Sequence, residues 1–162
     1  MESCRPLKHG LILPFREEKG NTPNLRRDGY LCVFAADYYG ASYKDVGNDG
    51  NEHEINMPSH KWMIDNFLEA RRDYAWGEQY DYFDHPDCVG WTRTGNDENP
   101  LGMAVLLSNG EDGKKHMETG SPESTYRDIT EHISEQVTTN KEGWGEFLCK
   151  GGSVSVWVPV DR

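Results

Sequence analysis

The residues best suited to chemistry lie in one short stretch, Tyr80 to Arg93, which reads YDYFDHPDCVGWTR. Asp84, His85 and Asp87 are close neighbours in it, and carboxylate oxygens are the ligands that hard cations such as Ca²⁺ prefer. Aspartate beside proline is also common in turns, where the carboxylate accepts hydrogen bonds from nearby backbone N–H groups. The pattern indicates either part of a cation site or an ordinary polar turn, and turn chemistry favours the second.

A second acidic segment, residues 45–56, imitates metal-binding motifs without completing one. Its sequence DVGNDGNEHEIN partly follows a calcium-binding loop, but Gly47 replaces an oxygen ligand and Asn56 replaces the bidentate glutamate. His53 and His60 are seven residues apart, whereas the HExxH zinc motif needs a spacing of four. We therefore interpret the segment as part of a long, solvated acidic loop at residues 37–56.

The overall composition restricts the partners. The 162-residue chain carries 28 acidic and 17 basic side chains, a formal net charge of −11. Nucleic acids and anionic membranes bind clustered Lys and Arg, so we expect neither as a partner. No apolar run approaches the roughly 20 residues that span a bilayer, and the N-terminus lacks a secretory signal pattern. We expect a cytoplasmic protein with free, buried thiols at Cys88 and Cys149; the oligomeric state stays open.

The patterns of the first 77 residues mix helix, loop and strand. The expected segments are a weak helix at 5–18, a polar Gly/Pro/Asn loop at 19–29, a continuous apolar run at 30–36 and a strong helix at 58–76. A continuous apolar run is typical of a strand covered on both faces, as in a parallel sheet. Apolar residues at helical spacing predict that one stripe of the helix is buried: Met63, Phe67, Ala70 and Tyr74.

Residues 78–162 carry only strand and turn signals. Short runs of strand-favouring residues alternate with Asn-Gly, Asp-Gly, Ser-Pro and Gly-Gly turns. The predicted strands are Tyr80–Phe83, Cys88–Thr94, Met103–Leu107, Lys114–Thr119, Thr125–Ile129, Gln136–Thr139, Gly145–Cys149 and Ser153–Val158. In the last strand Val154, Val156 and Val158 share one face, with Trp157 on the other. We expect an all-β Greek-key sandwich of antiparallel strands.

Three stretches are specific enough to indicate a family. They are DGYLCVFAADYYGASYKD at 28–45, KWMIDNFLEARRDYAWG at 61–77 and the opening stretch at 80–93, and the tail DIT…GWGEF…KGGSVSVWV continues the pattern. Together they resemble the end of the liquefying-type α-amylases of glycoside hydrolase family 13. The resemblance implies that residues 1–77 are an incomplete remnant of the (β/α)8 catalytic barrel, its last strand and last helix. Residues 78–162 would be the antiparallel β domain C.

The same resemblance implies that the chain has no catalytic and no substrate-binding residue. Retaining glycosidases use a carboxylate nucleophile and a carboxylic acid. Amylases add a third aspartate, and in this family all three stand on earlier barrel strands, upstream of Met1. We therefore expect the chain alone to be inactive. Leu31, Ala35 and an insertion near 19–27 depart from the family pattern and suggest a truncated or decayed gene product.

The resemblance also implies part of a calcium site. Some relatives bind calcium where the barrel meets domain C, and the matching positions here are Pro86 (through its carbonyl), Asp87 and Asn109. Relatives commonly have aspartate in place of Asn109, and an amide oxygen brings no charge, so the affinity should fall. The other ligands would lie on the absent barrel. We expect no tight calcium binding.

The function expected from the sequence is that of an α-amylase fragment. The parent activity is endo-hydrolysis of α-1,4-glucosidic bonds in starch or glycogen, with an α-glucan as partner. The alternative is a non-catalytic β-sandwich module that binds polysaccharide or docks on another protein. Aromatic faces stack on sugars, so Trp91, Trp144 and Trp157 are candidates for a binding platform, although tryptophans in strands more often serve as core.

Overall fold

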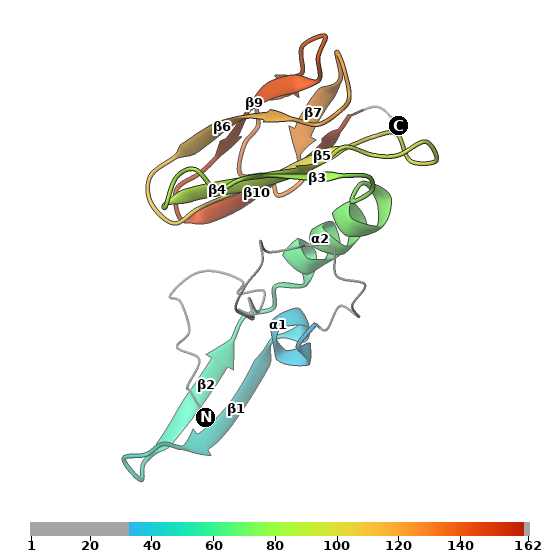
Figure 1. Cartoon of the computed structure of the whole chain (residues 1–162). Helices are drawn as coiled ribbons and strands as arrows, with labels where there is room; N and C mark the ends of the chain where they lie inside the picture. Colours follow the sequence, from blue (N-terminus) through green and yellow to red (C-terminus); the bar gives the residue numbers. More distant parts are fainter. Residues whose placement is uncertain (1–32, 161–162) are drawn as a thin grey trace, which may run out of the picture. The chain divides into compact units, whose positions relative to one another are not determined.

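A computed structural model describes residues 33–160 of the chain (Figure 1). The chain divides into two compact units, whose described parts are residues 33–65 and 66–160. The weak helix at 5–18, the insertion at 19–27 and the first residues of the run at 30–36 lie outside the described residues. Neither described helix has the length and apolar character needed to cross a membrane.

The unit of residues 33–65 is built around a hairpin. It contains α1 (Ala35–Tyr39), β1 (Ala41–Val46), β2 (Glu52–Met57) and the first turns of α2 (Lys61–Asp73). β1 and β2 are antiparallel, with Ala41 opposite Met57 and Val46 opposite Glu52. Gly50 takes a positive φ of 77° in the connecting turn, a conformation that favours glycine.

One prediction for this unit was wrong, and a second is not confirmed. Residues 37–56 form the end of α1 and the hairpin, where a loop was expected, because apolar and polar residues alternate at the period of a strand. The described end of the run at 30–36 is irregular and then helical, where a strand was expected. Strand backbone groups need a neighbouring strand. Among the described residues no strand is available beside this run, so the expected barrel strand is not confirmed.

The unit of residues 66–160 is an antiparallel β-sandwich (Figure 1). One sheet has the strand order β3-β4-β5-β10-β7-β8, and a second pairs β6 with β9. The strands are β3 (Gln79–Tyr82), β4 (Cys88–Arg93), β5 (Met103–Ser108), β6 (Gly113–Glu118), β7 (Thr125–Asp128), β8 (Val137–Thr138), β9 (Trp144–Cys149) and β10 (Ser153–Pro159). All eight strands predicted from the sequence are confirmed. The last strand returns to lie between β5 and β7.

The larger core lies between the two sheets. Phe147 of β9 and Trp157 of β10 are fully buried, with ring centroids 5.8 Å apart, and Tyr126 meets Phe147 edge to face at 5.5 Å. The Trp157 indole N–H donates to the Leu148 carbonyl at 3.0 Å, which satisfies the polar end of the buried ring. Three aromatic rings therefore fill the centre of this core.

A second core lies on the other face of the six-stranded sheet, where the part of α2 from Asn66 onward packs. Ala70 and Tyr74, both buried, contact a cluster that includes Val156 and Val158 of β10. The Asn66 side-chain amide donates to the Ile129 carbonyl at 3.0 Å. The predicted helix is thus confirmed with narrower bounds. Its buried stripe is confirmed for Ala70 and Tyr74, whereas Met63 and Phe67 are only half-buried.

Replacing Phe147 with alanine tests the inter-sheet core. Loss of a fully buried ring leaves a cavity, so we expect the free energy of unfolding to fall by about 3–5 kcal/mol. Urea denaturation followed by tryptophan fluorescence measures the change. Leu107→Ala is the control, because Leu107 is 38% exposed and should cost less than about 1 kcal/mol. Equal losses in the two variants would contradict this assignment of the core.

Candidate functional site

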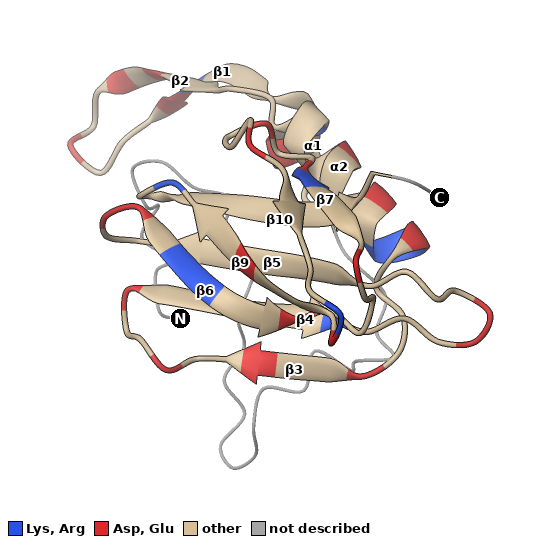
Figure 2. Ribbon diagram, turned by 90° about the horizontal axis from the view of Figure 1, so that it is seen from above, with Lys and Arg blue, Asp and Glu red and all other residues tan. Residues whose placement is uncertain are grey.

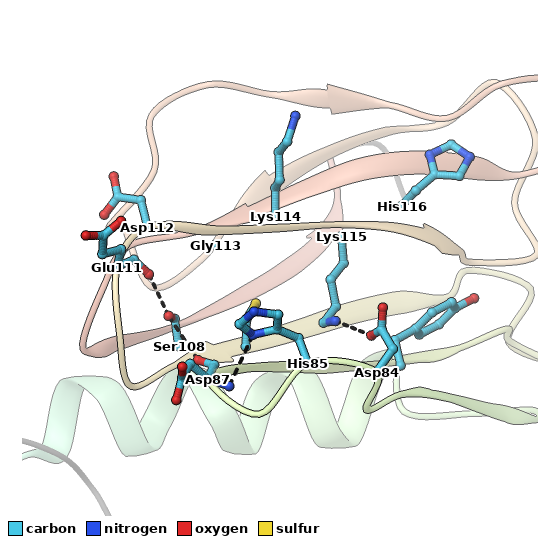
Figure 3. Close-up of a pocket in the computed structure, with 12 residues that line it drawn as sticks. Asp84, His85, Asp87, Ser108, Glu111, Asp112, Gly113, Lys114, Lys115 and His116 are labelled. Atoms are coloured by element: carbon cyan, nitrogen blue, oxygen red, sulfur yellow. Dashed lines mark hydrogen bonds and ion pairs between the residues drawn. The ribbon is translucent and has the colours of Figure 1, made fainter.

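An open cleft of about 640 Å³ lies between the β3–β4 loop and the β5–β6 turn (Figure 3). Asp84, His85 and Asp87 line one wall, and the turn together with the first half of β6 forms the other. Within β6, Lys115 points into the cleft, whereas Lys114 and His116 point away from it. The Asp84–Asp87 segment noted in the sequence therefore lines a concave, polar cleft.

The main chain of Asp87 ties the two loops together. Its carbonyl accepts a hydrogen bond from the Asn109 N–H at 3.0 Å, and its own N–H donates to Nδ1 of His85 at 3.2 Å. The Ser108 hydroxyl lies 3.2 Å from the Asp87 carbonyl and 2.7 Å from the Glu111 carbonyl. One hydroxyl has one proton, so the shorter contact to Glu111 is the stronger bond. Asp87 and Asn109 are thus side by side.

Lysines engage two carboxylates of the cleft. Asp84 forms an ion pair with Lys115, whose side chain is only 6% exposed. Asp112 pairs with Lys150 at 2.7 Å and accepts the Gly151 N–H at 2.9 Å. Hydrogen bonds from the two lysines hold the pKa of Asp84 and the pKa of Asp112 below the ordinary value. Both carboxylates therefore stay ionised and connect separate loops.

Charge is unevenly spread over the sandwich. Figure 2 shows acidic residues in the loops that join the strands and a basic band on β6. That band contains Lys114, which pairs with Glu146 of β9 at 3.1 Å, and Lys115. Lys115 is the member that sequence reasoning missed. The alternation in β6 gives the signal, because Lys115 and the buried Met117 stand two residues apart and so share a face.

The cleft offers too few oxygens to hold calcium by itself. Within the described residues, His, Cys, Asp and Glu side chains form no group of three or more that could bind a metal ion. The side chains of Asp87 and Asn109 supply a minority of the six to eight oxygens that Ca²⁺ takes. The ammonium of Lys115 adds positive charge to the same cleft. These residues fit at most half of a calcium site.

The polar side chains of the acidic segment at 45–56 form hydrogen bonds with one another and with the segment's own backbone. Asp49 accepts a hydrogen bond from the Asn51 N–H at 3.0 Å, and Nε2 of His53 lies 3.0 Å from the same carboxylate. The Asn51 backbone bond, followed by the His53 bond, lowers the pKa of Asp49. This carboxylate therefore shapes the hairpin turn.

The three tryptophans proposed as a sugar platform have different environments. Trp157 is fully buried, which agrees with the favoured assignment of these tryptophans to the core, and Trp91 packs against the second core. Trp144 is half-buried; the His116 ring stacks on it at 5.2 Å, and Tyr82 meets it edge to face at 6.3 Å. No sequence pattern signals this group, because pairing of β6 with β9 and the approach of β3 create it.

The two described cysteines confirm the prediction of free thiols. Cys88 and Cys149 are both buried and unpaired with each other. Burial raises the pKa of the Cys149 thiol, which makes the thiolate rarer at neutral pH. Neither thiol is therefore a candidate nucleophile.

Sequence comparison relates the chain to bacterial α-amylases, although no protein-family model matches it. It is 47% identical over 137 residues to an α-amylase of Geobacillus stearothermophilus, covering 83% of this chain and 23% of the relative. It is 42% identical over 156 residues to the cytoplasmic α-amylase of Escherichia coli K12, covering 95% of this chain and 29% of the relative. It is also 42% identical over 136 residues to a glucan 1,4-α-maltohexaosidase of Bacillus sp. strain 707, covering 82% of this chain and 24% of that relative. The chain spans about a quarter of the length of these curated relatives.

Asp84→Asn tests the ion pair in the cleft. The variant leaves the buried Lys115 ammonium without its counter-ion, so we expect a lower urea midpoint at pH 7. The pKa of Asp84 is below its ordinary value of 3.8 when folded. The stabilisation is therefore present above about pH 4 and is lost as the pH falls through the folded-state pKa. The deficit of the variant should shrink in acid.

Glu146→Gln is the matched control for that measurement. Its partner Lys114 is 65% exposed, and exposed pairs contribute little. If both variants unfold at the same urea concentration at pH 7, the Lys115–Asp84 pair has no special role.

Proposed function

We propose that this chain, an α-amylase homologue that matches about a quarter of its relatives' length, is the C-terminal part of an α-amylase-like glycoside hydrolase. The activity of the whole enzyme would be endo-hydrolysis of α-1,4-glucosidic bonds in starch or glycogen. The observation that carries the proposal is the identity of 47% over 83% of the chain. The sandwich of residues 78–160 would be domain C, and α2 the last helix of the barrel.

The contribution of this part to the enzyme would be structural. Ala70 and Tyr74 fix α2 to the sandwich through a buried apolar contact, and the Asn66 amide adds a hydrogen bond to Ile129. A helix that belongs to the barrel and packs on domain C would hold the two domains in one arrangement. The sandwich would thereby support the barrel from which the substrate cleft is made.

We infer that the chain alone does not hydrolyse glucans. A retaining glycosidase needs a carboxylate nucleophile and a carboxylic acid whose pKa is raised, so that it is protonated at neutral pH. In the cleft, lysines lower the pKa of Asp84 and of Asp112, which is opposite to what a general acid needs. The catalytic groups would come from the remainder of the enzyme.

Starch hydrolysis tests this inference in two preparations. The chain alone should release no reducing sugar from soluble starch above the buffer rate. A chimera of the Geobacillus α-amylase, in which the whole chain replaces the matched stretch, should hydrolyse starch, because the chain would complete the enzyme. Sugar release by the chain alone would contradict its inactivity. An inactive chimera would overturn the assignment as a C-terminal part.

For calcium, we propose a partial contribution from Pro86, Asp87 and Asn109. The structure brings Asp87 and Asn109 next to each other, which supports a shared role. The amide of Asn109 brings no charge, and the Asp87 carbonyl already accepts a backbone hydrogen bond. Bound calcium would connect this cleft to the rest of the enzyme, because this chain and the rest of the enzyme would each supply some of the oxygen ligands.

Calcium titration of the isolated chain should detect no site tighter than millimolar, since too few ligands are present. Isothermal titration calorimetry at neutral pH measures this directly. Asn109→Asp restores a charged ligand and should strengthen whatever weak binding occurs. A micromolar site in the unmodified chain would contradict the proposal.

A second function, polysaccharide binding without catalysis, has support from one group. Trp144 and His116 form a stacked, partly exposed pair on the outer side of β6 and β9. Its support is weaker, because the His116 ring already covers one face of the indole. Retention of the whole chain on insoluble starch tests this function. Trp144→Ala should abolish retention, whereas Trp76→Ala should not, because Trp76 is exposed but lies outside the stacked pair. That result would favour polysaccharide binding over a purely structural part of an amylase.

We also propose a cytoplasmic location. One relative is a cytoplasmic α-amylase. The free buried thiols Cys88 and Cys149 are compatible with a reducing compartment.

A further inference from the structure

Three side chains of the described residues stand directly before a glycine and carry a carboxylate or an amide. The three steps are Asp49–Gly50, Asn109–Gly110 and Asp112–Gly113. At such a step the backbone nitrogen of the glycine can attack the side-chain carbonyl carbon, because glycine allows the backbone to bend into the cyclic geometry. The reaction needs a side chain that is free to turn toward its own backbone. The contacts of the three side chains therefore decide which step is reactive.

Hydrogen bonds restrain the side chains of both aspartates. Asp49 accepts the Asn51 N–H at 3.0 Å and the Asn51 side-chain amide at 3.2 Å. Asp112 accepts the Lys150 ammonium at 2.7 Å and the Gly151 N–H at 2.9 Å. These bonds also hold the pKa of each aspartate below its ordinary value, so both stay ionised. An ionised carboxylate resists attack by a nitrogen, and we expect neither step to react.

The Asn109–Gly110 step has no comparable restraint from the described residues. Within residues 33–160, neither the Asn109 side-chain amide nor the Gly110 N–H forms a hydrogen bond. Both residues are exposed. The attacked carbonyl is a neutral amide, and its carbon accepts a nucleophile more readily than the carbon of a carboxylate. This step is therefore the reactive member of the three.

The surrounding turn is anchored on both sides of the step. The Asn109 N–H donates to the Asp87 carbonyl at 3.0 Å, and the Ser108 hydroxyl lies 2.7 Å from the Glu111 carbonyl. Gly110 also approaches the neighbouring loop closely, since a Cβ on Gly110 would lie 3.3 Å from Cβ of Asp87. A chemical change at this step would therefore take place beside the Asp87 side chain.

We propose that Asn109 is a site of deamidation. The Gly110 nitrogen forms a bond to the side-chain carbonyl carbon of Asn109, and the bond between that carbon and the amide nitrogen breaks. Ammonia leaves with the proton that the Gly110 N–H gives up. Water then opens the cyclic imide at one of its two carbonyls, which leaves aspartate or isoaspartate. The net reaction consumes one water and releases one ammonia.

The reaction would place a second carboxylate beside Asp87. A charged oxygen binds Ca²⁺ more strongly than an amide oxygen does. The effect on calcium rests on the proposed function, in which Asp87 and Asn109 both contribute oxygens, whereas the deamidation itself does not. The negative charge of this part of the cleft would rise with the age of the protein.

Peptide mapping by mass spectrometry tests the modification in the full chain during warm incubation at neutral pH. The peptide that contains Asn109 should exchange NH₂ for OH about tenfold or more faster than those that contain Asn96 or Asn140. These two are internal references, because their side-chain oxygens accept backbone N–H groups and no glycine follows them. An Asn109 amide that lasts as long as that of Asn140 would overturn the inference.

Two further measurements test the route. Asn109→Gln keeps an amide but would have to close a larger ring, so position 109 should then stay intact. Enzymatic methylation detects isoaspartate, which forms only through the cyclic imide. A product that contains aspartate without isoaspartate would show direct hydrolysis and would overturn the attack by Gly110.

Calcium titration separates the modification from the function. The aged chain should bind calcium up to about tenfold more tightly than the equally aged Asn109→Gln variant. Deamidation without a gain in calcium binding would overturn the calcium contribution of Asn109 and uphold the modification. An intact amide in the aged chain, together with tighter calcium binding by Asn109→Asp, would overturn the modification and uphold the calcium contribution.

Discussion

β10 contributes side chains to both cores of the sandwich, and the rest of the sandwich depends on this double burial. Trp157 points between the sheets and meets Phe147, whereas Val156 and Val158 point to the other face, against α2. The period of two in a strand makes this possible, because consecutive residues serve opposite faces. β10 therefore joins four elements into one unit. It pairs with β5 and β7 through backbone hydrogen bonds, and its side chains pack on β9 and α2.

The polar residues of the sandwich mostly serve architecture. Asp112 connects the β5–β6 turn with the β9–β10 turn through Lys150, and Asp84 connects the β3–β4 loop with β6 through Lys115. Such pairs fix loops at the edge of a cleft without doing chemistry.

The two units differ in how much apolar surface they bury. Residues 66–160 have two apolar cores, whereas the hairpin of residues 33–65 leaves the Tyr43 side chain half exposed. Independent stability is therefore expected only for the unit of residues 66–160.

Predictions from the sequence succeeded where the signal was local and failed where it needed a neighbour. The strands after residue 78 were found because Gly, Asn and Pro turns mark their ends. The hairpin was missed because its acidic residues suggested a solvated loop, although Tyr43 and Ile55 alternate with polar residues. The run at 30–36 was expected to be a strand because it is apolar throughout. Its described end is helical, since hydrogen-bonding partners for a strand do not lie beside it among the described residues.

The sequence by itself determined the family resemblance, the strand-rich second half and the two faces of β10, because motifs and periodicity need no knowledge of contacts. It also placed Asp87 and Asn109 in a common site through that resemblance. Only the tertiary structure decided that Lys115 is the counter-ion of Asp84, that Trp157 is core and that Trp144 stacks on His116. These facts depend on which strands become neighbours across the sandwich. That choice is set by packing of whole sheets, to which residues far apart in the chain contribute together.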